Sequence, residues 1–222
     1  MANSVSVEQN EGNAPKLLVG LVGWVGILAC AAGGVLWALS PIGIHLSELK
    51  FHTPNVFWKM FWPAPLLILL GLIGLRLRHW GRSELLERLG FSLAALGLAM
   101  IIAGDIGLYW LGIDDIFIVA APAYRAFRIG LLVLAVGSIL FSVGAGRNET
   151  LPLGSALPLA IASLAGMISF AADLDSLGAA LWILFGLGWA WLGLSLVAAE
   201  ITSLATGKRA IAADLPNDRA RG

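Results

Sequence analysis

The chain has 222 residues, of which 59% are hydrophobic and 13% are charged, and its formal net charge at pH 7 is zero. A soluble domain carries roughly a quarter charged residues, so this composition excludes an ordinary soluble protein. Without net positive charge there is no reason to expect nucleic acid as a partner. The single cysteine excludes an internal disulfide and a cysteine-rich metal site, and we expect neither a bound metal nor a cofactor.

Six apolar segments follow one another along the chain, each about 20 residues long, the length that crosses a hydrocarbon core of about 30 Å. They cover approximately residues 17–39, 56–75, 91–111, 123–143, 151–171 and 177–199. The pattern predicts an all-α integral membrane protein, a bundle of about six transmembrane helices in the lipid bilayer. We expect a disordered cytoplasmic N-terminus over 1–16, a transmembrane domain over 17–200 and a cytoplasmic tail over 201–222.

Prolines mark several predicted breaks. The first segment is predicted to stop at Ser40-Pro41, and Pro63 and Pro65 predict a kink or a broken first turn in the second. The fourth segment is predicted to begin after Pro122. Whether the apolar loop 113–122 re-enters the membrane stays open.

The distribution of Lys and Arg predicts the orientation of the chain in the membrane. With a cytoplasmic N-terminus, ten such residues lie inside: Lys16, Arg76, Arg78, Arg82, Arg88, Arg147, Lys208, Arg209, Arg219 and Arg221. Four lie outside: Lys50, Lys59, Arg125 and Arg128. We therefore expect a multi-pass membrane protein with both termini in the cytoplasm.

Two stripes of glycine recur every seven residues, the period of the seam in a left-handed helix pair. They are Gly90, Gly97 and Gly104 on the third segment, and Gly130, Gly137 and Gly144 on the fourth. Small residues let membrane helices approach closely. We expect both stripes to serve helix packing, against each other or against another neighbour.

A weak internal repeat pairs the first three segments with the last three. Residues 26–37 align without gaps on 130–141, and the run Gly-Leu-Tyr-Trp-Leu-Gly at 107–112 is similar to the run at 188–193. Two inverted three-helix halves are a known plan of transporters. Chance identity is the open alternative, because Gly, Ala and Leu dominate these segments.

Asp105 is the most informative residue. It lies about seven residues before Gly112, which at 1.5 Å per residue places it roughly 10 Å below the outer surface. An ionisable residue facing lipid there costs at least about 2.5 kcal/mol, so we expect Asp105 to face the bundle interior. Arg128, with Arg125 one turn away on the same face, is its natural ion-pair partner, and Tyr109 is placed to line the same cavity.

Three interpretations of this cluster stay open: a structural ion pair, part of a substrate, ion or proton pathway, or a catalytic site. The last has least support because no nucleophile–base partner is evident. At the level of function, we favour small-solute, ion or proton transport through the bundle. The alternative is a non-enzymatic accessory or scaffold subunit, with further copies of the chain or other membrane subunits as partners.

Overall fold

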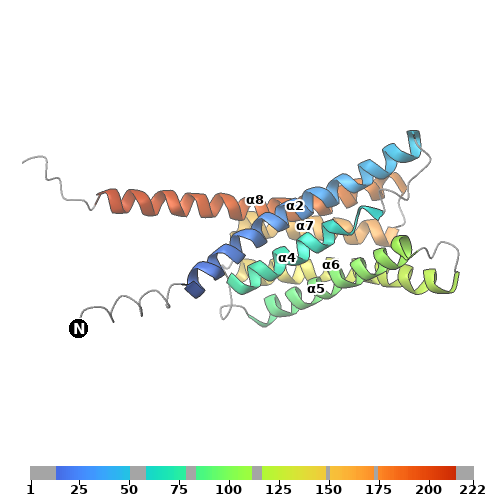
Figure 1. The fold of residues 1–222 in the computed structure, drawn as a ribbon, viewed down its shortest axis with the longest axis horizontal. Coiled ribbons are helices and arrows are strands. Elements are labelled where there is room, and N and C mark those ends of the chain that lie inside the picture. The colour runs from blue at the N-terminus through green and yellow to red at the C-terminus, as the bar shows by residue number, and fades with distance from the viewer. Residues whose placement is uncertain are drawn as a thin grey trace, which may run out of the picture.

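The computed structural model describes residues 14–50, 59–78, 84–111, 117–148, 151–172 and 175–213. Within these ranges the chain is helical and contains no strand, which confirms the predicted all-α bundle. The elements are α2 (Ala14–Lys50), α4 (Pro63–Arg78), α5 (Leu85–Asp105), η1 (Ile106–Trp110), α6 (Phe117–Arg147), α7 (Leu153–Ala172) and α8 (Asp175–Ala213). Successive helices run in alternating directions along one bundle (Figure 1).

The helices form a closed ring in which each packs on its neighbours in sequence, and α8 closes the ring on α2. The contact between α5 and α6 is the most extensive, and those between α2 and α4 and between α2 and α8 follow. The junction between α4 and α5 is the weakest in the ring. Few residue pairs form this junction. In one of them, the guanidinium of Arg76 on α4 lies 5.8 Å from the ring centroid of Phe91 on α5.

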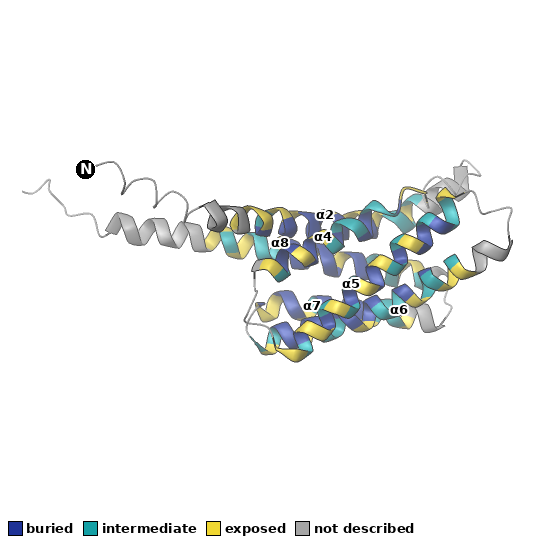
Figure 2. Ribbon diagram, turned by 60° about the horizontal axis from the view of Figure 1, so that its bottom comes forward, coloured by how far each residue is buried: buried dark blue, intermediate teal, exposed yellow. Residues whose placement is uncertain are grey.

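The described helices carry large apolar side chains on their outer faces as well as on the inner ones. Buried and exposed residues alternate along each helix (Figure 2). Large aliphatic side chains face outward on every described α-helix. Leu21 of α2 and Leu153 of α7, for example, are 64% and 74% exposed. A soluble bundle would bury such a surface, whereas lipid accommodates it.

Four helical stretches are long and apolar enough to cross a membrane: Gly20–Gly43, Leu85–Trp110, Pro122–Arg147 and Gly178–Thr202. Two shorter apolar stretches, Pro63–Leu77 and Leu153–Ile168, belong to α4 and α7, which pack among them. These helices identify a membrane protein by length and composition. That six helices span the bilayer stays a prediction, as does the orientation of the termini.

The predicted end of the first helix at Ser40-Pro41 is wrong, because α2 continues through Pro41 to Lys50. Proline has no N–H to donate to the carbonyl four residues earlier, which here belongs to Trp37. The hydroxyl of Ser40 donates to that carbonyl instead, at 2.7 Å. A local side-chain donor therefore lets the helix pass a proline that would otherwise leave an orphan acceptor.

Other helix limits also differ from the prediction. α8 continues to Ala213, beyond the predicted end near residue 199, because a helix satisfies its own backbone and needs no lipid to persist. α6 begins at Phe117, so Pro122 lies inside it and residues 117–121 are helical. α4 begins at Pro63, as expected of a proline in the first helical position, after a turn over 60–62.

The glycines of α5 and α6 lie in the contact between these two helices. A Cβ added at Gly104 would lie 2.7 Å from the backbone nitrogen of Phe127, and one at Gly144 would lie 2.6 Å from that of Glu87. Gly90, Gly97 and Gly137 are closer still to backbone atoms of the opposite helix, while Gly130 faces Gly97 and Ile101. Only hydrogen fits at these positions, so the two backbones approach more closely than side chains would allow.

A second close contact joins α2 and α8, the first and last helices of the ring. A Cβ at Gly186 would lie 2.5 Å from the backbone nitrogen of Ala38, and one at Gly193 would lie 2.5 Å from that of Ala31. Gly186 and Gly193 are seven residues apart, the same period as the stripes on α5 and α6. Gly26 packs in the same way on Gly74 of α4.

The ring order is compatible with two three-helix halves. In the repeat alignment Gly193, which packs on Ala31, corresponds to Gly112, and Gly112 lies outside the described residues. The duplication therefore stays a prediction from sequence.

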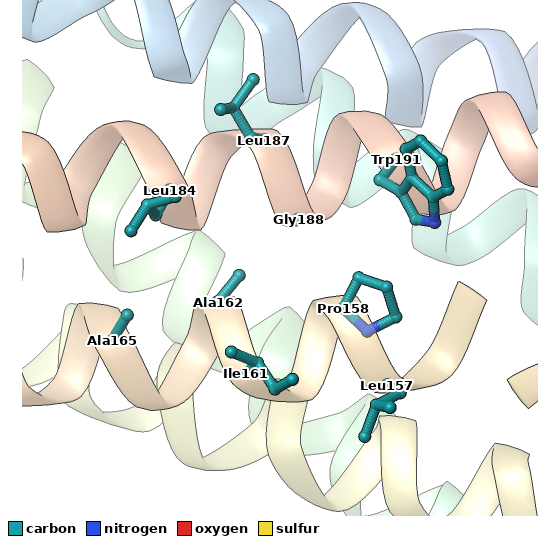
Figure 3. Close-up of a pocket in the computed structure, with 9 residues that line it drawn as sticks. All are labelled: Leu157, Pro158, Ile161, Ala162, Ala165, Leu184, Leu187, Gly188 and Trp191. Carbon is teal, nitrogen blue, oxygen red and sulfur yellow. The ribbon is translucent and has the colours of Figure 1, made fainter. Parts of the chain in front are cut away.

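Between α7 and α8, an indole donates the hydrogen bond that a proline cannot donate to the helix backbone. Pro158 lies inside α7 and leaves the carbonyl of Gly154, four residues earlier, without its helical donor. The Nε1 of Trp191 on α8 donates to this carbonyl at 2.8 Å. Pro158 and Trp191 lie close to each other across the space between the two helices (Figure 3).

Candidate functional site

Asp105 is the last residue of α5 and is fully buried, with an exposed fraction of 0%. Directly after it, the helix widens into the π-helical turn η1, in which the N–H of Leu111 bonds to the carbonyl of Ile106 at 3.2 Å. The end of this turn is tied to another part of the chain, since Trp110 Nε1 donates to the carbonyl of Lys59 at 2.9 Å. Single π-helical turns in α-helices often occur at functional sites.

Neither carboxylate oxygen of Asp105 has a hydrogen-bond partner among the described residues. The predicted ion pair with Arg128 or Arg125 is therefore not formed, and that prediction was wrong. The guanidinium of Arg128 lies 5.6 Å from the ring centroid of Tyr124, on its own helix, and Arg125 is exposed. Tyr109 lies in η1, half-buried, and its hydroxyl makes no hydrogen bond to the carboxylate.

The rotation of α6 explains why the arginines miss Asp105. The side of α6 that faces α5 carries Phe127, Gly130 and Leu134, three and four residues apart. Arg128 follows Phe127 and is turned about 100° away from that side, because an α-helix has 3.6 residues per turn. An aromatic ring and not a cation thus lies opposite Gly104, the neighbour of Asp105.

Phe127 belongs to a layer of aromatic rings at this level of the bundle. Its ring centroid lies 6.3 Å from that of Phe61 and 6.5 Å from that of Trp182. Trp37 contacts both of these rings, at 4.9 Å and 5.4 Å, and Phe185 at 5.2 Å. We call these five residues the aromatic layer. It joins α2, α6 and α8, and its member Phe127 packs on Gly104, the residue before Asp105.

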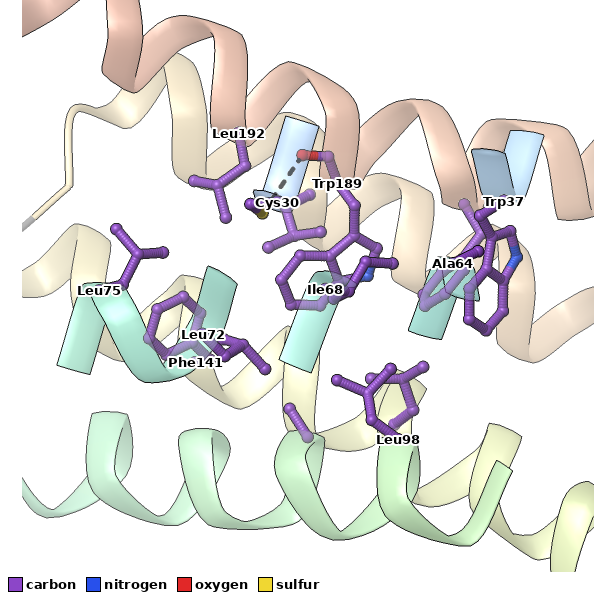
Figure 4. Close-up of a cluster of buried hydrophobic side chains, with 14 of the residues drawn as sticks. Cys30, Trp37, Ala64, Ile68, Leu72, Leu75, Leu98, Phe141, Trp189 and Leu192 are labelled. Carbon is purple, nitrogen blue, oxygen red and sulfur yellow. Dashed lines mark hydrogen bonds between the residues drawn. The ribbon is translucent and has the colours of Figure 1, made fainter. Parts of the chain in front are cut away.

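Two indole donors in the core are also unsatisfied. Trp37 and Trp189 are fully buried, and no described group accepts a hydrogen bond from either Nε1. In the buried cluster that Figure 4 shows, Trp189 contacts the core beside Ile68, and its backbone carbonyl accepts a long hydrogen bond from Cys30 Sγ at 3.6 Å. Unsatisfied buried polar groups are few in native proteins, and each calls for an explanation.

The buried serine hydroxyls of the bundle are satisfied, unlike the carboxylate of Asp105. The hydroxyls of Ser138, Ser142 and Ser163 donate to the carbonyls four residues earlier, each at 2.7 Å. Ser195 of α8 donates to the hydroxyl of Ser155 of α7 at 2.7 Å. Among the described buried side chains, atoms without a hydrogen-bond partner are thus confined to Asp105, Trp37 and Trp189, and of these only Asp105 is ionisable.

Glu87 is a second buried carboxylate on α5, and the sequence did not single it out. It is 5% exposed, and its Oε2 accepts a hydrogen bond from Asn148 Nδ2 at 3.3 Å. Its distance from the glycine stripe could have indicated this burial. Glu87 precedes Gly90 by three residues and therefore lies on the same packed side of the helix.

In the part of the chain that the structure describes, no three His, Cys, Asp or Glu side chains gather in a group that could hold a metal ion. Comparison of the chain with protein-family models, curated proteins and solved structures finds no match.

Proposed function

We propose that this membrane protein transports a proton or a small cation, and that Asp105 is the residue that binds it. The observation that carries the proposal is the complete burial of a carboxylate whose two oxygens have no hydrogen-bond partner among the described residues. Burying an ionised carboxylate without a partner costs several kcal/mol. A proton or cation that binds and leaves removes this cost for part of a transport cycle.

The weak junction between α4 and α5 supports a route to this residue. Asp105 lies on α5, whose contact with α6 is tight along its whole length. Opening the bundle between α5 and α6 would break the close backbone contacts of the glycines, whereas separating α4 from α5 disrupts far fewer interactions. We infer that access to Asp105 opens at the junction between α4 and α5.

The test measures flux in liposomes that contain the purified full-length chain. A potassium diffusion potential drives proton uptake, which an enclosed pH-sensitive dye reports, and a second series follows Na⁺. We expect flux with the natural chain and its loss with Asp105→Asn. Glu87→Gln is the matched control, because it neutralises a buried carboxylate of the same helix while Asn148 keeps an acceptor.

Flux in the natural chain and in Glu87→Gln, lost only in folded Asp105→Asn, supports the proposal. It is rejected if the natural chain moves neither ion, or if Asp105→Asn transports as well as the natural chain. Circular dichroism of each variant in detergent establishes that the helices are retained.

A non-enzymatic accessory subunit is the second candidate. The close backbone contacts between α5 and α6 and between α2 and α8 favour it, because they make a rigid bundle whose outer faces are free to join other membrane subunits or a second copy. Absence of flux, together with a defined homo- or hetero-oligomer of the chain extracted in mild detergent, would favour this candidate over transport.

A further inference from the structure

Two apolar grooves flank α7, one on each side of the exposed ridge formed by Leu153, Leu157 and Ile161. The groove between α7 and α8 has a volume of about 390 Å³ and is drawn in Figure 3. The groove between α6 and α7 has a volume of about 250 Å³. Leu157 lines both, and it is 58% exposed, so the grooves open on the outer surface of the bundle.

Small residues create the groove between α6 and α7. Gly146 of α6 and Ala156 and Ala160 of α7 line its floor, and a Cβ at Gly146 would lie 3.5 Å from that of Ala156. Larger residues at these positions would fill the space. An elongated apolar group, such as an acyl chain, fits a depression of this kind on a membrane-facing surface.

The two grooves differ in charge. The groove between α6 and α7 ends at Arg147, the last residue of α6, whose side chain is exposed. Of the side chains that line the other groove, only Trp191 has a polar atom, and its Nε1 already donates to the carbonyl of Gly154. A cation at the mouth of an apolar groove is complementary to an anionic lipid, whose acyl chain and phosphate need both features.

We propose that the groove between α6 and α7 binds an anionic phospholipid, with an acyl chain along Ala156 and Ala160 and the phosphate on the guanidinium of Arg147. Arg147 lies at the end of the bundle where α4 ends and α5 begins, and Arg76 and Arg88 occupy the same end. The bound lipid thus belongs to the leaflet on the arginine-rich side of the protein. This site is separate from Asp105, near the other end of the same bundle.

The experiment compares thermal unfolding of the full-length chain in detergent with added phosphatidylglycerol or phosphatidylcholine of identical acyl chains. We expect phosphatidylglycerol to raise the midpoint of the natural chain more than phosphatidylcholine does. Arg147→Gln is expected to weaken phosphatidylglycerol binding about fivefold, the effect of about one basic residue at a membrane surface. Arg147→Lys keeps the charge and is expected to restore most of the binding.

Two matched controls separate the groove from general attraction of charge. Ala160→Phe fills this groove and is expected to abolish the preference, whereas Ala165→Phe fills the groove between α7 and α8 and is expected to preserve it. Arg125→Gln removes an exposed arginine from the opposite end of α6 and is also expected to preserve it.

The proposal fails if Arg147→Gln and Ala160→Phe keep the preference, or if Arg125→Gln lowers it as much as Arg147→Gln does. It also fails if the natural chain responds equally to both lipids. Detection of a dimer that Ala160→Phe dissociates would assign the groove to a second copy of the chain and would likewise overturn the lipid assignment.

Discussion

At the scale of single residues, Asp105 and Glu87 show that burial alone does not decide whether a carboxylate stabilises the fold. Both lie on α5 and both are buried, but Asn148 donates to Glu87 and no described group donates to Asp105. A partnered buried carboxylate stabilises the fold through its hydrogen bond, whereas an unpartnered one imposes its desolvation cost on the fold.

This difference predicts opposite effects on stability. Asp105→Asn is expected to raise the free energy of unfolding by on the order of 1 kcal/mol, because it removes a charge that the bundle leaves unpaired. Glu87→Met is expected to lower it by about 1 kcal/mol, because the amide of Asn148 loses its acceptor. Unfolding in SDS, followed by circular dichroism, measures both. Destabilisation by Asp105→Asn would show that the carboxylate has a stabilising partner and would weaken the transport proposal.

At the scale of helices, the close contacts between α5 and α6 and between α2 and α8 determine which neighbours meet. Lipid supplies no hydrophobic force between helices, so tight packing and the dispersion energy it brings must hold them together. The glycine spacing of seven residues indicated such contacts on α5 and α6. It did not indicate that α8 would use the same spacing against α2, because Gly186 and Gly193 are only one repeat.

Gly97→Ala tests the contact between α5 and α6. The added methyl group would meet the backbone of Leu134 and the carbonyl of Gly130, which cannot withdraw without moving α6. We expect a loss of about 1–3 kcal/mol in the free energy of unfolding, the range for overpacking of a dense contact. Gly20→Ala on α2 is the control: a Cβ there has no neighbour within 4 Å, and a change below about 0.5 kcal/mol is expected. Equal effects of the two substitutions would contradict close packing as the cause.

At the scale of the whole molecule, the alternation of helix directions places two sets of basic residues at opposite ends of the bundle. Arg76, Arg88 and Arg147 lie at one end, while Lys59 and Arg125 lie at the other. The excess of basic residues along the whole sequence predicts that the first end lies in the cytoplasm. Accessibility of the two ends from outside the cell is the measurement that tests this prediction.

Cysteine labelling in intact cells provides that measurement. A membrane-impermeant maleimide is expected to label Lys59→Cys from outside and Arg147→Cys only after the membrane is permeabilised. The natural chain is the control, because its one cysteine, Cys30, is fully buried and is expected to remain unlabelled. Labelling of Arg147→Cys in intact cells would reverse the orientation.

Hydropathy and glycine spacing were sufficient to predict the helical bundle, helices long and apolar enough to cross a membrane, and the sides of α5 and α6 that pack closely. These signals are periodic along one segment, and a helix converts them directly into faces. The burial of Asp105 was also predicted, because facing lipid would cost too much.

Only the tertiary structure decided which side chains of neighbouring helices contact each other. Phe127 of α6 faces α5, and Arg128, the next residue, points about 100° away from it. The carboxylate of Asp105 therefore lacks the arginine partner that the sequence predicted. Ser40 and Trp191 donate to the carbonyls that Pro41 and Pro158 leave without a helical donor, and α2 continues beyond the end that was predicted at Pro41. Such outcomes depend on which neighbour lies within about 3 Å of each group, a property of the assembled bundle and not of any single segment.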